Sequence, residues 1–287
     1  MKAKFVTTTA LVAFAGAAMA QDGINIGAGQ TLLGVQDTAT QFGNATGGGQ
    51  DSAGGSEVNS LWGSLGGGTL DLGIAGNLEG NFNKMWIFID ATAGGENTLQ
   101  GDNVDGGFNE IASMAGLTFD AGFEPDHAIR LEVGGGFLGI RFADLIDNTA
   151  GDIFTAGGTG DLPLVGAAGA FGITTGWDNS NIVGVDDVDA SGALTATTGV
   201  EFSIDLATAF GVTNSQIGIS VFISNDNGQF LSNQFLGETG LGGAGNVGDP
   251  TVLDLNTIAG NQFATIPAPA SMALLGLGGL AAARRRR

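Results

Sequence analysis

Residues 217–233, IGISVFISNDNGQFLSN, predict a β-hairpin. In the first half of this stretch apolar residues recur at every second position, which places them on one face of a strand. Asn227-Gly228 then interrupts the pattern, and Asn-Gly accepts the positive φ values of a type I′ turn. Two antiparallel strands joined at Asn225–Gly228 are therefore expected.

The same alternation recurs in four further windows, at residues 70–74, 85–89, 129–133 and 200–204. In the last of these, Glu201 lies on the opposite face, which is typical of a sheet with one wet side. Between Met85 and Ile89 the opposite face carries Trp86 and Phe88, so that strand is expected to be buried on both sides. Short strands and Gly-rich turns predict an all-β antiparallel β-sandwich or jelly roll with long Gly-rich loops. Short helices are expected at 142–146 and 206–210.

The N-terminal residues have the features of a secretory signal peptide. Lys2 and Lys4 precede an apolar stretch, and Ala18-Met19-Ala20 precede Gln21, which matches the Ala-x-Ala cleavage pattern. Residues 1–20 are therefore expected to form a signal helix, cleaved between Ala20 and Gln21. Residues 21–60 are rich in Gly, Asn and Thr and predict a flexible segment, or edge strands around 24–26 and 31–35. The β-sandwich domain is expected at 61–265.

The C-terminal stretch 266–287, IPAPASMALLGLGGLAAARRRR, combines two prolines, an apolar run and four arginines. Residues 266–283 carry no charge, and their number is at the lower limit of the roughly 17 to 25 residues of a transmembrane helix. The terminal arginines are expected to stay on the cytoplasmic side. They are Arg284, Arg285, Arg286 and Arg287.

This tail resembles the C-terminal sorting signal of bacterial PEP-CTERM proteins. Pro267, Ala268 and Pro269 stand at the Pro-Glu-Pro motif, with Ala in place of the central Glu. The resemblance implies recognition by an exosortase-type membrane protease, removal of the tail and delivery to the cell surface or extracellular matrix. Contact with the membrane is then limited to the C-terminal helix before processing. The alternative is a permanent C-terminal anchor.

The body between the two signals is strongly acidic. Its basic residues are Lys84, Arg130 and Arg141, against 29 acidic residues, so its formal charge is −26. Nucleic acid and anionic membranes are therefore poor partners, because phosphate binding relies on clustered Lys and Arg. Cations, neutral glycans and basic surfaces remain compatible with this charge. The chain has no Cys, so burial, hydrogen bonding or bound ions must stabilise the exported fold.

Four segments of the body also resemble a known type of domain. Residues 72–99, 116–136, 197–211 and 230–237 are similar, in order and pattern, to sugar-binding sandwiches related to DOMON domains and family 9 carbohydrate-binding modules. This resemblance implies a β-sandwich that binds extracellular polysaccharide.

The residues suited to catalysis are few. His127 is the only histidine, Cys is absent, and no Gly-x-Ser-x-Gly motif occurs. His127 lies at the entry of an expected strand, where a structural or solvent-facing role is favoured. The 29 carboxylates offer many pairs for a glycosidase, but their spacing in the fold does not follow from the sequence.

Two loops are candidates for ligand binding. Asp187, Asp189 and Ser191 match the first half of a D-x-D-x-S-G calcium loop, and the alternative there is a solvated acidic loop. Trp177, with Asp178 and Asn179 beside it, lies in a polar stretch where an indole could stack on a sugar ring. The alternative for Trp177 is that it closes the end of the sandwich.

The sequence thus predicts an exported cell-surface or extracellular-matrix protein with a structural or glycan-binding role and no catalysis. The alternative is a secreted, carboxylate-dependent enzyme that degrades polysaccharide.

Overall fold

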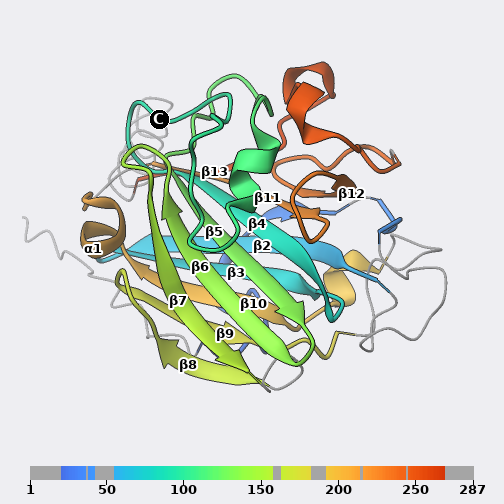
Figure 1. Ribbon diagram of the computed structural model, residues 1–287. Helices are drawn as coiled ribbons and strands as arrows, with labels where there is room; N and C mark the ends of the chain where they lie inside the picture. Colours follow the sequence, from blue (N-terminus) through green and yellow to red (C-terminus); the bar gives the residue numbers. More distant parts are fainter. Residues whose placement is uncertain are drawn as a thin grey trace, which may run out of the picture.

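The computed structural model describes residues 21–36, 38–42, 55–157, 163–181, 192–213, 216–243 and 245–268. Two antiparallel β-sheets pack face to face in this part of the chain, which confirms the all-β prediction (Figure 1). Most neighbouring strands in each sheet are also consecutive in the chain, so the jelly-roll part of the prediction is not confirmed.

The first sheet has six strands in the described residues, in the order β1-β2-β3-β10-β9-β8. These strands are β1 (Thr31–Val35), β2 (Glu57–Gly66), β3 (Thr69–Asn77), β8 (Leu164–Ala168), β9 (Ile173–Trp177) and β10 (Gly199–Asp205).

The second sheet has seven strands in the described residues, in the order β12-β11-β4-β5-β6-β7, and β13 pairs with β11. These strands are β4 (Asn81–Asp90), β5 (His127–Gly134), β6 (Phe137–Asp144), β7 (Thr149–Gly157), β11 (Ile217–Ser224), β12 (Leu231–Leu236) and β13 (Ala264–Ile266).

Helical structure is short in the described residues. The α-helix α1 (Leu206–Phe210) is capped by Asp205, whose side chain accepts a hydrogen bond from Thr208 N, and it confirms the helix expected there. The helix expected at 142–146 is wrong, because Phe142 pairs with Ile129 inside the second sheet. The 3-10 turns are η2 (Glu110–Met114), η3 (Ala193–Thr195), η4 (Pro250–Val252) and η5 (Leu255–Thr257).

The two sheets enclose the main hydrophobic core, to which every alternating window contributes its apolar side chains. Strand β4 is buried on both faces, as its sequence predicts. Met85, Ile87 and Ile89 lie in the main core, whereas Trp86 and Phe88 lie in a second core on the outer face of the second sheet. Parts of the connections 91–126 and 237–263 fold over that face and supply other residues of the second core, together with neighbouring strands of the second sheet.

The predicted hairpin forms between β11 and β12, but its turn differs from the expectation. Ser224 pairs with Leu231, which leaves a six-residue loop, and among residues 225–230 only Gly228 has a positive φ. The type I′ turn is therefore wrong. The Asn225 side chain accepts hydrogen bonds from the backbone N–H groups of Gln229 and Phe230 and so stabilises a wider loop.

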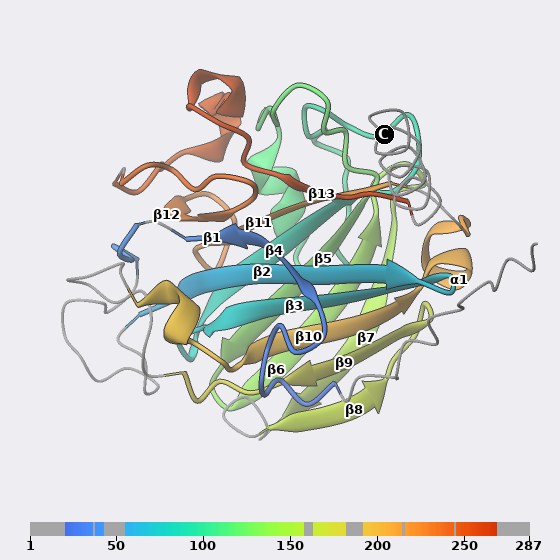
Figure 2. The same ribbon diagram turned by 180° about the vertical axis from the view of Figure 1, so that it is seen from behind.

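Residues 21–30, here called the N-terminal strap, lie across the outer face of the first sheet (Figure 2). Glycines in the sheet make room for it, since a Cβ on Gly176 would lie 2.3 Å from the backbone carbon of Gln21. Beneath the strap, Glu201 is only 2% exposed and accepts the N–H groups of Asp22 and Gly23. The wet face expected at Glu201 is thus covered by a polar backbone.

Both boundaries of the expected sandwich domain move outward. Strand β2 begins at Glu57, before residue 61, and β1 is a strand at Thr31–Val35 on the edge of the first sheet. At the other end, Ile266 pairs with Ile217 and is 5% exposed within the main core. The sandwich therefore includes Ile266, which the sequence assigns to the tail.

Candidate functional site

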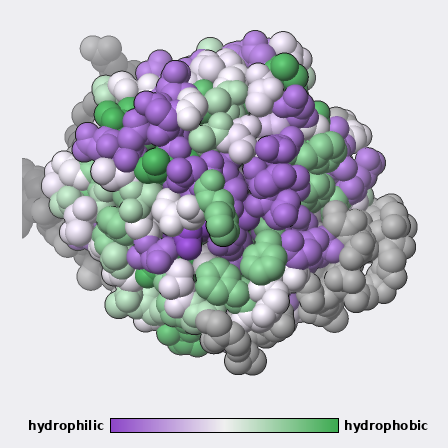
Figure 3. All heavy atoms as spheres, viewed as in Figure 1, coloured by the Kyte–Doolittle hydropathy of each residue, from purple (hydrophilic) through white to green (hydrophobic). Residues whose placement is uncertain are grey.

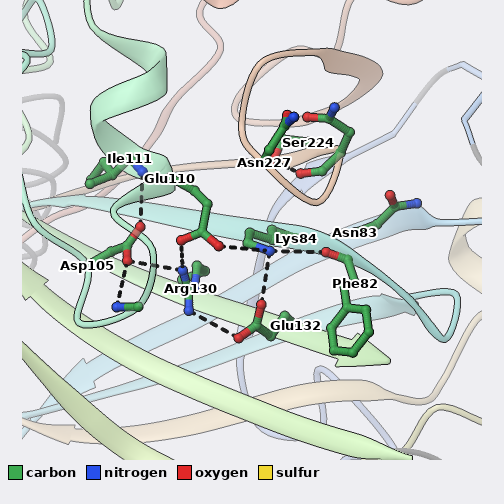
Figure 4. Close-up of polar contacts among 12 residues, drawn as sticks. Phe82, Asn83, Lys84, Asp105, Glu110, Ile111, Arg130, Glu132, Ser224 and Asn227 are labelled. Atoms are coloured by element: carbon green, nitrogen blue, oxygen red, sulfur yellow. Dashed lines mark hydrogen bonds and ion pairs between the residues drawn. The ribbon is translucent and has the colours of Figure 1, made fainter. Parts of the chain in front are cut away.

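A cluster of buried charges lies on the outer face of β4 and β5. Lys84 Nζ lies 2.9 Å from Glu132 Oε2 and 3.4 Å from Glu110 Oε1 (Figure 4). Arg130 binds the same two carboxylates, with Nη2 3.1 Å from Glu132 Oε1 and Nη1 in contact with Glu110. The four side chains form a closed ring of alternating charge, here called the charged cluster, and each is at most 10% exposed.

Local structure explains how the charged cluster forms. The register of β4 and β5 places Lys84 directly opposite Glu132, where opposite charges stabilise an antiparallel pair. Glu110 comes from η2 and is positioned by Asp105, which accepts hydrogen bonds from Gly107 N and Ile111 N. Asp105 Oδ1 also lies 3.1 Å from Arg130 Nη1, so this loop is tied to the sheet by charge.

The third basic residue of the body lies beside the charged cluster. Arg141 Nε is 2.9 Å from Asp152 Oδ1, and a Cβ on Gly107 would lie within 3 Å of both Arg141 Nη1 and Arg130 Nη2. The backbone at Gly107 thus rests on both guanidinium groups. All basic side chains of the body are engaged on one face, and Glu110 and Glu132 are both neutralised there. These ion pairs hold the covering loop against the sheet.

Phenylalanine rings lie around the charged cluster at the surface. Phe82 is 42% exposed with its ring against Gly134, and Phe108, next to Gly107, is 95% exposed. The half-buried ring of Phe137 covers Gly139 near Glu132. These three residues are here called the phenylalanine patch. Figure 3 shows hydrophobic residues gathered among hydrophilic ones in the middle of this face.

A second polar group surrounds a cavity of about 200 Å³ at the start of β5 and the end of β6. His127 Nδ1 lies 2.8 Å from Asp126 Oδ1, and its Nε2 lies 3.7 Å from Asp144 Oδ2. Burial acts to raise the pKa of Asp126, but hydrogen bonds from His127, Thr92 and Ala91 outweigh it and lower that pKa below its usual value. Asp126 is therefore ionised and accepts the proton on Nδ1.

The structure corrects the expected glycan site. Trp177 is fully buried at the end of β9, opposite Val200, so its ring offers no face for a sugar. The polar residues beside it satisfy backbone groups instead, because Asn179 bonds both the N–H and the carbonyl of Leu78, and Asp178 accepts Ser180 N. The alternative, a Trp that closes the sandwich, is what the burial supports. Trp86 is also buried.

Several other predictions fall outside the described residues. They concern the calcium loop with Asp187, Asp189 and Ser191, the cleavage residues Ala18 and Ala20, and the tail residues Pro269 and Arg284–Arg287. Gln21 is described and buried, and Pro267 is exposed with Ala268 half-buried after it. Within the described ranges, no group of three His, Cys, Asp or Glu side chains could hold a metal ion. No helix in these ranges is long and apolar enough to cross a membrane.

Neither polar group stood out in the sequence. The residues of the charged cluster come from β4, η2 and β5, and they meet only through strand register and loop folding. The scarcity of basic residues was the one available signal, because three isolated cations among 29 acids are expected to find carboxylate partners.

Comparison with known proteins identifies the tail. Residues 265–287 match the model of the PEP-CTERM protein-sorting motif. This motif indicates a protein that is exported and anchored transiently at the membrane before processing, and such motifs are generally processed by exosortase, a membrane protease. No curated protein and no solved structure matches the chain, so the resemblance to DOMON domains and family 9 carbohydrate-binding modules is not confirmed.

Proposed function

We propose that this protein is a non-catalytic component of the cell surface or extracellular matrix that performs a structural role by associating with glycans. The observation that carries the proposal is the distribution of charge. Lys84, Arg130 and Arg141 are all engaged in ion pairs on one face, and their carboxylate partners among the described residues are Asp105, Glu110, Glu132 and Asp152. Because the body has 29 acidic residues against these three basic ones, negative charge predominates on its exterior.

Such an exterior selects among polymers. It repels anionic polysaccharides, nucleic acid and anionic membranes, and it leaves neutral and cationic glycans as partners. The phenylalanine patch supplies apolar ring faces on which the CH groups of a sugar can pack. Phe108 favours this role, since a large apolar side chain that is 95% exposed has no packing function in the fold.

Retention on insoluble polysaccharides tests the proposal. The exported protein should co-sediment with neutral cellulose or cationic chitosan, and not with alginate gel, at moderate salt. Replacing both Phe82 and Phe108 by Ala should reduce retention on cellulose about thirtyfold, because each ring is expected to contribute about 1 kcal/mol. Val252→Ala is the matched control, because Val252 is 82% exposed on η4 and lies outside the phenylalanine patch. Equal retention of all variants, or none by the wild type, contradicts the proposal.

The competing enzyme hypothesis has a separate test. The same preparation is incubated with a panel of polysaccharides, and released reducing ends are measured. Glu110 and Glu132 form the carboxylate pair that Lys84 and Arg130 bridge. Turnover that is lost in Glu132→Gln would show that the protein is an enzyme and would overturn the non-catalytic role.

A further inference from the structure

The cavity beside His127 has the composition of a binding site for a group that only donates hydrogen bonds. Its polar side chains are Thr92, Asp126, His127, Asp144 and Asp147. The Asp126 carboxylate accepts hydrogen bonds from the Thr92 hydroxyl and from His127 Nδ1. The side-chain atoms left to face a ligand are therefore acceptors.

His127 is the most informative of these residues. Its side chain is only 7% exposed, and its ring packs against those of Phe142 and Phe210, with centroids 5.3 and 4.7 Å away. In the tautomer that donates Nδ1–H to Asp126, Nε2 is the acceptor nitrogen of the ring. The 3.7 Å separation from Asp144 Oδ2 is too long for a hydrogen bond. The ring is thus nine-tenths buried and lines the cavity, and its Nε2 makes no hydrogen bond with any residue that the structure describes.

Asp144 is arranged in a complementary way. Its Oδ1 accepts the N–H groups of Ile146 and Asp147, at 3.0 and 2.9 Å, which fixes the carboxylate. Its Oδ2 faces His127 Nε2 across the 3.7 Å gap. One nitrogen about 2.8 Å from each of these atoms would bridge them with two hydrogen bonds. An ammonium group fits this arrangement because it has three donors and no acceptor.

The charge and the volume of the cavity limit the class of ligand further. Three carboxylates line the cavity, and Phe210 adds an aromatic ring that attracts cations. The body carries a formal charge of −26, which favours approach of a cation and opposes that of an anion. A cavity of about 200 Å³ accepts one small ring rather than an extended polymer, so the terminal unit of a chain is the part that enters.

We propose that this cavity, formed by Asp126, His127, Asp144, Asp147 and Phe210, binds the protonated amino sugar at the end of a cationic glycan. The ammonium nitrogen lies between His127 Nε2 and Asp144 Oδ2, and the sugar ring extends toward Asp147 and Phe210. That the ammonium is carried by a sugar rests on the proposed association with glycans, whereas the ammonium site rests on the cavity alone.

The single histidine provides a direct test. In the untagged exported protein, the imidazole of His127 gives the only histidine signal in a proton–nitrogen or proton–carbon NMR spectrum. Titration with glucosamine should shift this signal saturably. Glucose and N-acetylglucosamine, which lack the ammonium, should bind at least about tenfold more weakly, because each hydrogen bond to a charged group contributes about 1.5–3 kcal/mol. Ethylammonium should also bind more weakly than glucosamine, because it has no sugar ring.

Two variants that each remove one negative charge complete the test. Asp144→Asn should weaken glucosamine binding about tenfold with the melting temperature little changed, since the Asp144 side chain is 26% exposed. Asp226→Asn, in the exposed β11–β12 loop, should bind like the wild type. No saturable shift, equal binding of glucose, or equal loss in Asp226→Asn would overturn the site. Equal binding of ethylammonium would overturn the amino-sugar assignment. The retention assay on cellulose is read independently, so failure of that proposal is distinguishable from failure of this one.

Discussion

At the scale of single residues, the charged cluster has a consequence for stability. Lys84→Met removes one of the two cations that neutralise Glu110 and Glu132 and leaves buried carboxylates under-compensated. The free energy of unfolding is expected to fall by about 3–5 kcal/mol, measured by urea denaturation. Asp152→Asn is the matched control. It breaks the ion pair with Arg141 at a carboxylate that is 51% exposed, and should lower stability by at most about 1 kcal/mol. Equal losses of unfolding free energy in Lys84→Met and Asp152→Asn would show that the charged cluster does not stabilise the fold more than a surface ion pair does.

Glu201 gives a pH-dependent prediction. Burial raises the pKa of Glu201 above its usual 4.5, although hydrogen bonds from Asp22 N and Gly23 N oppose the shift. The folded protein therefore binds this proton more tightly than the unfolded chain does. The resulting stabilisation is present below pH 4.5 and is lost as pH rises through the folded pKa.

Glu201→Gln lacks this dependence and keeps an oxygen that can accept both N–H groups. The free energy of unfolding of Glu201→Gln minus that of the wild type should rise with pH from about 4.5 upward and then level off. Urea denaturation at a series of pH values measures this difference. A difference that does not vary with pH would show that Glu201 has the same pKa in both states.

At the scale of elements, strand β13 decides where the tail can be cut. Ile266 packs in the main core, and a Cβ on Gly63 would lie 2.6 Å from its Cδ1. Ile266→Ala should lower the free energy of unfolding by about 2 kcal/mol or more, as is usual for buried Ile.

The sorting motif begins at residue 265, inside this strand. Mass spectrometry of the processed protein should therefore find a C-terminus at Pro267 or later, and a C-terminus before Ile266 would contradict this.

The elements also show what the sequence could predict. Alternation located five strands of the main core, namely β3, β4, β5, β10 and β11, and the apolar run Met85–Ile89 correctly indicated a strand buried on both faces. The solvent-exposed face predicted at Glu201 is wrong, because a polar face has the same sequence pattern whether water or a polar backbone covers it. The exposed indole predicted at Trp177 is also wrong, because the neighbouring side chains of Asp178 and Asn179 bond the backbone rather than solvent. The charged cluster and the His127 cavity depend on strand register and loop packing, which composition does not reveal.

At the scale of the whole molecule, the excess of acid predicts a dependence on salt. A body of formal charge −26 repels itself in the compact state, and the Debye length falls from about 30 Å at 0.01 M salt to about 10 Å at 0.1 M. The melting temperature at neutral pH should therefore rise with sodium chloride over this range, as calorimetry would show. A melting temperature that falls with salt would mean that the charged cluster, rather than the exterior, dominates the electrostatics.

The position of β13 also has a mechanical consequence. Ile266 lies at the start of the sorting motif and is the last core residue in the described part of the chain, and β13 is held by pairing of three residues with β11. While the tail is still anchored, any tension between the membrane and the body enters the sandwich through this short strand. The first structure to yield under load is therefore β13, and its release would uncover Ile217 and Ile219 at the edge of β11 while the remaining strand pairs stay intact.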